Sequence, residues 1–406
     1  MIDAIFDWGL TLFLVGLTIY AIFWLIPWLW TLIQFLRDEW ALAHLTDTKD
    51  LEARLNRLAA EYVASRPQAK LTIGIVQKGN RFVKGYNGQK ADGPPPDENS
   101  LYEIGSITKV FTALMLAKLD QEGVVSISQS LADLLPEDHN YPEEIRRIRL
   151  GQLATHTAGL PRLPSNLDEF VKDEADPYVW YARAQLFAGL ANTTLEQAPG
   201  TKSSYSNYGM GLLGQLLAMK TGENYEGLCK RLIAEPLRLT ATCCSPDEAT
   251  GSRLVVGRTP KGDPAPNWHF DALAGAGALR SSARDLLTFL EANRNPSEDA
   301  LGQAMEKTQE IHFRTWLGPH QGLAWVIEQD DPKNPAWFWH NGATGGYCSF
   351  AAFDPAKQLS LVLLSNYGDA SIGDGSLDHM GMKILRIAAK VSLEESAADK
   401  QAAASN

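Results

Sequence analysis

The sequence predicts an α/β (more narrowly α+β) fold, in which an antiparallel β-sheet flanked by helices is combined with a mostly helical region. Two strand-like runs, 71–76 and 81–86, come early in the chain, and four more lie between residues 322 and 365. The stretch between these groups, about residues 106–271, is mostly helical and loop-like. The sheet is therefore expected to join chain segments from before and after the helical region.

Each expected element has its own signal in the sequence. Apolar residues recur at helical spacing over 48–64, ahead of Pro67. The first two strands turn around Lys78-Gly79-Asn80. The later strands are expected at 322–328, 337–340, 347–353 and 359–365, with a closing helix near 377–391. Residues 393–406 are expected to form a disordered tail.

The N-terminus predicts a membrane anchor. Residues 8–36 carry no charged side chain, and tryptophans flank this run and cluster toward its C-terminal end. At about 1.5 Å per residue, such a helix exceeds the roughly 30 Å hydrocarbon core of a bilayer. A cleaved signal peptide fits worse, because Asp3 and Asp7 precede the run without any Lys or Arg. A buried helix of a soluble protein is the other interpretation. We expect an anchor at 1–45 and a folded domain at 46–392.

A serine and a lysine begin one apolar helical run. Ser106 and Lys109 stand three residues apart, so they share a helix face and the ammonium can reach the hydroxyl. A serine hydroxyl is a weak nucleophile until a base removes its proton. A lysine desolvated among apolar neighbours can act as that base. Unpaired N–H groups at a helix start can stabilise an oxyanion. Ser-x-x-Lys alone is nevertheless a weak signal, because many surface helices contain it by chance.

A second candidate pair lies on a loop that enters a helix. Tyr205 and Asn207 stand between the Pro199-Gly200 turn and the apolar segment 210–219. Side chains at such a place can point into a cleft. A packed tyrosine beside an asparagine that caps the helix explains the pair equally well.

A third candidate segment contains His340 and Gly342, between the runs 337–340 and 347–353. Glycines there let a ligand approach the backbone closely. The alternative is an ordinary histidine at the end of a strand.

In this order and at these separations, the three segments together resemble the serine β-lactamase and penicillin-binding protein superfamily, most closely its class C branch. That branch uses Ser-x-x-Lys, then Tyr-x-Asn, then Lys-Thr-Gly or His-x-Gly. The segment 153–161, Leu-Ala-Thr-His-Thr-Ala-Gly-Leu-Pro, is similar to another segment of the family, in which His156 takes a turn position and has no catalytic role. The resemblance covers roughly residues 50–390. It implies a β-lactamase/transpeptidase-like fold, an α/β domain beside an all-helical one with the site between them.

The resemblance also implies a role for each site residue. Ser106 attacks a carbonyl and becomes acylated, while Lys109 deprotonates it or holds a shared hydrogen-bond network. Tyr205 serves as acid/base toward the leaving group and the hydrolytic water, and needs nearby cations to do so near neutral pH because its free pKa is about 10. Asn207 binds the substrate amide or carbonyl, and the N–H groups of Ser106 and Ala343 form the oxyanion hole. His340 and Gly342 complete the substrate-binding set. The mechanism requires no metal and no cofactor.

One departure from the family bears on the substrate. His340 stands where β-lactamases carry a lysine that attracts the substrate carboxylate, and a histidine is mostly neutral at pH 7. We therefore expect weak β-lactam hydrolysis and a membrane-anchored serine hydrolase of amide or ester bonds, of the D-peptide peptidase/carboxypeptidase or esterase type. A genuine class C-type β-lactamase is the alternative. A non-catalytic scaffold and an acylated penicillin sensor are alternatives of another class, from which turnover would distinguish an enzyme.

The net charge of the chain narrows the range of expected binding partners. The formal net charge is −11 and no basic cluster occurs, so nucleic acid is not an expected partner, whereas a small molecule or peptide is. The four cysteines are expected to be small buried thiols. Basic residues follow the anchor, which by the positive-inside rule favours a cytoplasmic domain. The family resemblance favours the other side, and we expect a single-pass protein with a periplasmic or extracellular catalytic domain.

Overall fold

The computed structural model describes residues 51–391 and 393, apart from 317, 330–334, 370–372, 374 and 392. The predicted anchor at 8–36 and nearly all of the predicted tail lie outside the described residues. None of the helices within the described part combines the length and hydrophobicity that a membrane span requires.

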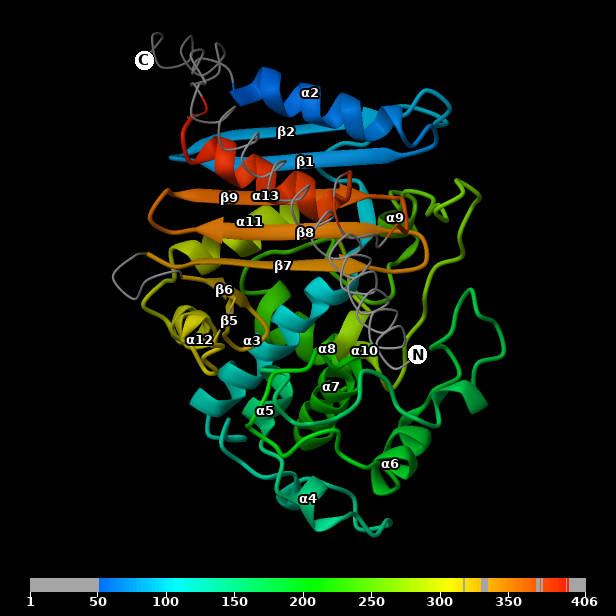
Figure 1. The fold of residues 1–406 in the computed structure, drawn as a ribbon, viewed down its shortest axis with the longest axis vertical. Helices are drawn as coiled ribbons and strands as arrows, with labels where there is room; N and C mark the ends of the chain where they lie inside the picture. The colour runs from blue at the N-terminus through cyan, green and yellow to red at the C-terminus, as the bar shows by residue number, and fades with distance from the viewer. Residues whose placement is uncertain are drawn as a thin grey trace, which may run out of the picture. The chain divides into compact units, whose positions relative to one another are not determined.

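The described residues form a seven-stranded antiparallel sheet, with the strand order β2-β1-β9-β8-β7-β6-β5 (Figure 1). Its strands are β1 (Lys70–Gln77), β2 (Asn80–Asn87), β5 (His320–Gln321), β6 (Val326–Glu328), β7 (Trp337–Ala343), β8 (Cys348–Asp354) and β9 (Leu359–Ser365). β1 pairs with β2 on one side and with β9 on the other. This arrangement confirms that strands from before and after the helical region share one sheet.

Helices cover both faces of the sheet. α2 (Leu51–Ala64) and α13 (Leu377–Ala388) contact each other and the sheet, and α11 (Ala283–Arg294) packs on its opposite face (Figure 1). The covered strands β8 and β9 are accordingly buried along their whole length. The sequences of β8 and β9 are mostly apolar because neither face of these strands is exposed to water.

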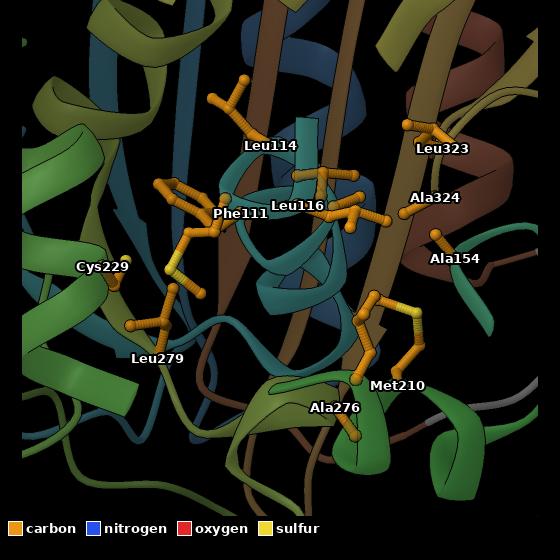
Figure 2. Close-up of a cluster of buried hydrophobic side chains, with 14 of the residues drawn as sticks. Phe111, Leu114, Leu116, Ala154, Met210, Cys229, Ala276, Leu279, Leu323 and Ala324 are labelled. Atoms are coloured by element: carbon orange, nitrogen blue, oxygen red, sulfur yellow. The ribbon is translucent and has the colours of Figure 1, made fainter. Parts of the chain in front are cut away.

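The remaining helices of the described residues are α3 (Thr108–Gln121), α4 (Glu143–Arg146), α5 (Leu150–Ala154), α6 (Arg183–Ala191), α7 (Asn207–Thr221), α8 (Tyr225–Cys229), α9 (Glu248–Gly251), α10 (Ala274–Gly277) and α12 (Ala300–Gln309). α3 contacts α7, α8, α10 and α12, among others. It is apolar almost all round, as a helix buried on all sides must be. Figure 2 shows its side chains Phe111, Leu114 and Leu116 in the core, with Met210 of α7 and Leu323 close by.

The structure corrects three details of the expected strands. The run 322–328 is not one strand, because a turn with Ala324 at φ +62° separates β5 from β6. β7 continues past His340 to Ala343, since β8 still pairs with it there. A small second sheet, β3 (Leu101–Glu103) paired with β4 (Arg280–Ser282), was not expected, because three-residue strands are too short to show alternation.

Aromatic rings connect the helical region to the sheet. Phe111 of α3 stacks on Phe289 of α11 with ring centres 4.1 Å apart, and Phe289 in turn stacks on Trp325 at 6.4 Å. Trp325 meets Phe353 of β8 edge-on at 5.2 Å. All four rings are buried, so this chain of contacts ties α3, and with it Ser106 just before the helix, to the sheet.

We expect Phe111→Ala to lower the free energy of unfolding by about 3–5 kcal/mol, because it removes a fully buried ring and leaves a cavity. The measurement is urea denaturation of the full chain. Trp316→Ala is the control: its side chain is 93% exposed, so its effect should stay within about 0.5 kcal/mol. Equal effects of the two substitutions would contradict this account of the core.

Candidate active site

Ser106 lies in a single 3-10 turn, Gly105–Ile107, between β3 and α3. Gly105 has φ +49°, and a Cβ there would stand 2.7 Å from the backbone nitrogen of Ala343, so a side chain has no room. A Cβ on Gly342 would likewise stand 2.9 Å from the nitrogen of Ser106. The two glycines let β7 approach the serine turn, which brings together the N–H groups of Ser106 and Ala343. The pair that the sequence nominated as an oxyanion hole is thus adjacent.

Lys109 is completely buried on the first turn of α3. Its Nζ donates to Ser106 Oγ at 2.8 Å and to the carbonyl oxygen of Ala276 at 2.6 Å. Within the described residues, no carboxylate pairs with it. Burial, and after it the positive charge of Arg162, holds the pKa of Lys109 well below its usual value. The lowered pKa favours the neutral amine, which is the form that can accept the Ser106 proton.

Tyr205 contacts the same two groups. Lys109 Nζ is 4.9 Å from the centre of its ring, and the phenol forms a hydrogen bond with Ser106. The sequence argument required nearby cations to lower the pKa of Tyr205. Instead, burial raises this pKa to about 12, against the opposing effects of the Ser106 hydrogen bond and the Arg162 charge. The phenol is therefore protonated before the substrate binds. Tyr205 must donate its proton before it can act as a base.

Asn207 is the first residue of α7 and does not cap it. The cap is Ser206, whose Oγ accepts from the backbone N–H of Gly209 at 2.9 Å. The Asn207 side-chain oxygen is buried and has no hydrogen-bond partner within the described ranges. It lines a cavity of about 30 Å³ together with Ser106 and Ala343. An unpaired buried acceptor beside the nucleophile can accept a hydrogen bond from a substrate N–H. This bond is favourable because a buried acceptor without a partner costs free energy.

Three aromatic side chains complete the wall of that cavity, and the sequence argument did not name them: Tyr178, Trp268 and Phe270. Tyr178 stacks on Phe270 with ring centres 4.9 Å apart and meets Trp268 edge-on at 5.1 Å. Glu103 fixes this wall, because its Oε1 accepts from the backbone N–H of Trp268 at 2.9 Å. The sequence signal that could have revealed this wall is Glu103, a carboxylate in the otherwise apolar strand that precedes Ser106.

His340 is buried in β7, and the structure removes its positive charge altogether. Burial lowers its pKa to about 3, and Lys109 acts in the same direction when it is protonated. Its Nδ1 lies 2.6 Å from the carbonyl oxygen of Asn341. Since a carbonyl only accepts, Nδ1 carries the proton and Nε2 presents a lone pair. His340 therefore offers a substrate carboxylate neither a charge nor a free N–H at this position.

Two residues of the segment around 153–162 also reach Tyr205. His156 takes the expected turn position, with φ +59°, and its Nδ1 accepts from the N–H of Ser206 at 3.2 Å. Its ring centre is 4.5 Å from that of Tyr205, so it also holds the tyrosine in place. The exposed Arg162, which follows directly after this segment, places its Cζ 5.2 Å from the centre of the Tyr205 ring. Sequence reasoning missed Arg162.

Within the described part of the chain, no group of three or more acidic, histidine or cysteine side chains could hold a metal ion. Cys229, Cys243, Cys244 and Cys348 are free thiols.

Acid should destabilise the fold through His340. Its pKa is lower in the folded chain than in the unfolded one, so the unfolded state binds the extra proton and stability falls as pH drops from about 6.5 toward 3. When the pH is lowered from about 7.5 to about 5, we expect the free energy of unfolding to fall by about 2 kcal/mol less in His340→Gln than in the wild type. Denaturant titrations at the two pH values measure this difference. Equal losses in both proteins would show that His340 titrates normally.

Comparison with known proteins agrees with this geometry. A family model described as Beta-lactamase matches residues 55–375. A beta-lactamase of Pseudomonas fluorescens is 28% identical over 330 residues, covering 73% of this chain and 88% of the relative. The D-alanyl-D-alanine-carboxypeptidase/endopeptidase AmpH of Escherichia coli K12 is 27% identical over 301 residues, covering 70% and 76%. The crystal structure of a beta-lactamase/D-alanine carboxypeptidase from Pseudomonas syringae shares the fold, with a TM-score of 0.71 at 24% identity over 83% of this chain and 98% of that one. The chain belongs to the beta-lactamase family, as a serine hydrolase similar to class C beta-lactamases and D-Ala-D-Ala carboxypeptidases.

Proposed function

We propose that this protein hydrolyses amide or ester bonds through an acyl-serine intermediate, as a D-peptide peptidase/carboxypeptidase or an esterase. The observation that carries the proposal is the contact of 2.8 Å between Lys109 Nζ and Ser106 Oγ, made by a buried lysine that has no counter-ion among the described residues. A neutral amine in contact with a serine hydroxyl is the arrangement that turns the hydroxyl into a nucleophile.

The acylation step follows from the contacts. Lys109 takes the Ser106 proton as Oγ attacks the substrate carbonyl, and the N–H groups of Ser106 and Ala343 hold the oxyanion. The bond to the leaving group then breaks, and Tyr205, protonated at rest, donates its proton to the leaving amine or alcohol. The Lys109 ammonium that has just formed lies 4.9 Å from the Tyr205 ring and compensates the phenolate.

Deacylation reverses these proton transfers. Water replaces the leaving group, the Tyr205 phenolate takes its proton, and the hydroxide attacks the acyl carbonyl. When the ester bond breaks, Ser106 Oγ recovers a proton from Lys109. Asn207 would bind the substrate amide in both steps, since its side-chain oxygen is buried beside the serine and no described residue pairs with it.

Beta-lactam hydrolysis is the second candidate. Relatives carry the names beta-lactamase and carboxypeptidase/endopeptidase, so both activities occur among proteins similar to this one. The neutral His340 favours the peptidase or esterase, because this part of the site gives a β-lactam carboxylate no charge to bind.

We also propose that residues 8–36 anchor the protein in a membrane, with the catalytic domain on the periplasmic or extracellular side. The uncharged run and its flanking tryptophans support the anchor, and the outward location of the family's best-known members supports the side. A phosphatase reporter fused after residue 406, which works only outside the cytoplasm, is expected to be active. An inactive reporter, with a cytoplasm-specific reporter active at the same position, would reverse the orientation.

The first functional test is a change of the nucleophile. We expect Ser106→Ala to lower the hydrolysis of para-nitrophenyl acetate by the full-length protein at least about a thousandfold, because the substitution removes the acyl acceptor. Tyr205→Phe should cost about a hundredfold or more with an unactivated amide or alkyl ester, whose leaving group needs the proton that Tyr205 donates. Hydrolysis that Ser106→Ala leaves unchanged would contradict the proposal.

Benzylpenicillin separates the two candidate activities. Intact-protein mass spectrometry is expected to show either no adduct or a slowly cleared adduct that Ser106→Ala abolishes. Rapid, complete turnover of the antibiotic would instead identify a beta-lactamase and would overturn the interpretation of His340.

A further inference from the structure

We infer that a second pocket, away from Ser106, binds a small soluble molecule that carries a phosphate group. The pocket has a volume of about 400 Å³ and lies between the loop 92–100 and the segment 252–258. It borders the start of β1 and the end of β9, which are neighbours in the sheet (Figure 1). None of the described residues that line it also lines the cavity beside Ser106. The inference therefore goes beyond the proposed function and does not depend on it.

Three basic side chains line this pocket: Lys70, Arg253 and Arg258. Lys70 Nζ donates to the carbonyl oxygen of Pro94 at 2.8 Å, which leaves N–H groups of the ammonium for a ligand. Burial lowers the pKa of Lys70, the charge of Asp92 opposes this shift, and the charge of Arg258 adds to it. The charges of Lys70 and Arg258 are thus close enough to repel each other. Like charges held close together favour an anion that contacts both.

The two arginines are poorly paired within the described residues. Arg258 Nε is buried there without a hydrogen-bond partner, and Nη1 donates to the carbonyl oxygen of Gly262 at 3.4 Å. The salt bridge of Arg258 with Asp92 is long, at 3.6 Å, and the Asp92 side chain is 94% exposed. In the same part of the chain, no carboxylate forms a salt bridge with Arg253. A phosphate that displaces Asp92 can accept paired, charge-assisted hydrogen bonds from Arg258.

The second acidic residue of the pocket, Asp97, does not neutralise these cations. Its Oδ1 accepts from the backbone N–H of Asn99 at 2.9 Å and from the Ser100 hydroxyl at 3.0 Å. This carboxylate therefore stabilises its own turn. Three basic side chains face one loosely paired carboxylate and one carboxylate engaged elsewhere, so the pocket attracts anions although the whole chain is acidic.

Both walls of the pocket are fixed against the sheet. A Cβ on Gly85 of β2 would stand 1.7 Å from the carbonyl oxygen of Pro96, so this glycine lets the proline-rich loop lie directly on the strand. On the other wall, the backbone N–H of Arg258 donates to the carbonyl oxygen of Asn366, directly after β9, at 2.8 Å. The backbone of the site is therefore in place before a ligand binds, and binding requires little further ordering.

The remaining side chains indicate which kind of phosphate the pocket takes. Apolar residues stand beside the cations, among them Pro94, Leu254, Val255 and Val256, and Val256 is 58% exposed. An apolar part of the ligand would cover this surface, which favours an organic phosphate over inorganic phosphate. The exposed Asp92 and the net charge of −11 oppose approach to an anionic bilayer, which favours a soluble molecule over a lipid headgroup.

The test measures the binding of phenyl phosphate to the full-length protein in detergent micelles, by isothermal titration calorimetry at fixed ionic strength. We expect Arg258→Gln to weaken binding on the order of tenfold, because it removes charge-assisted hydrogen bonds. Arg253→Gln should weaken binding on the order of fivefold, the size expected for one partly exposed charge pair. Inorganic phosphate should bind more weakly than phenyl phosphate, and added sodium chloride should weaken both.

Asp92→Asn provides a test that misfolding cannot imitate, because it predicts a gain. The substitution removes the carboxylate that competes with the ligand for Arg258, so phenyl phosphate should bind more tightly, on the order of threefold. Glu235→Gln is the matched control, since it removes another exposed carboxylate with a long salt bridge, 3.9 Å to Lys230. Arg147→Gln is the control for the arginine substitutions, because it removes an exposed charge from α4. Neither control should change the affinity.

Three results would overturn the inference. The first is an affinity for phenyl phosphate that is unmeasurable, or that Arg258→Gln and Asp92→Asn leave unchanged. The second is a loss of binding in Ser106→Ala, which should bind as the wild type does, because such a loss would place the ligand at the catalytic site. The third is displacement of phenyl phosphate by phosphatidylglycerol added to the micelles, which would assign the phosphate to a lipid. Ester hydrolysis by the same proteins tests the proposed function separately.

Discussion

The burial of Lys109, with no counter-ion in the part of the chain that the structure describes, is the constraint on which the site depends. An ammonium removed from water with no carboxylate partner is strongly disfavoured, so the group gives up its proton more easily and becomes a base. That outcome needs a shell that excludes water on all sides of the first turn of α3. The helices around α3 and the carbonyl of Ala276 supply this shell. The helical region therefore sets the chemistry of Lys109 as well as enclosing it.

Burial also sets the charge pattern around Ser106. It favours the neutral forms of Lys109, His156 and His340, and it keeps the Tyr205 phenol protonated. The interior of the site consequently holds little net charge before the substrate arrives. Charge develops only during the reaction, as protons move between Ser106, Lys109 and Tyr205. The proton transfers therefore start from a largely neutral interior.

Sequence reasoning located the site well where short-range geometry decides the outcome. The three-residue spacing of Ser106 and Lys109 is a property of one helical turn, and the strands that form the sheet are visible as apolar runs. Sequence reasoning failed where burial by distant chain segments decides the protonation state of a residue. The raised pKa of Tyr205 and the proton position on His340 depend on segments packed around them, not on their neighbours in the chain. Arg162 and Trp268 carry no motif, because only the folded chain brings Arg162 to Tyr205 and Trp268 to the cavity beside Ser106.

The pairing of β1 with β9 has a consequence for the order of events during synthesis. Ile73 of β1 lies opposite Leu363 of β9, nearly 300 residues later in the chain. A growing chain therefore exposes an apolar strand without its partner until almost the whole protein has left the ribosome. The backbone nitrogen of Ala343, beside Ser106, is also made late. Ser106 is synthesised long before Ala343, whose N–H would help to stabilise the transition state of acylation. The nascent chain consequently cannot act on a substrate.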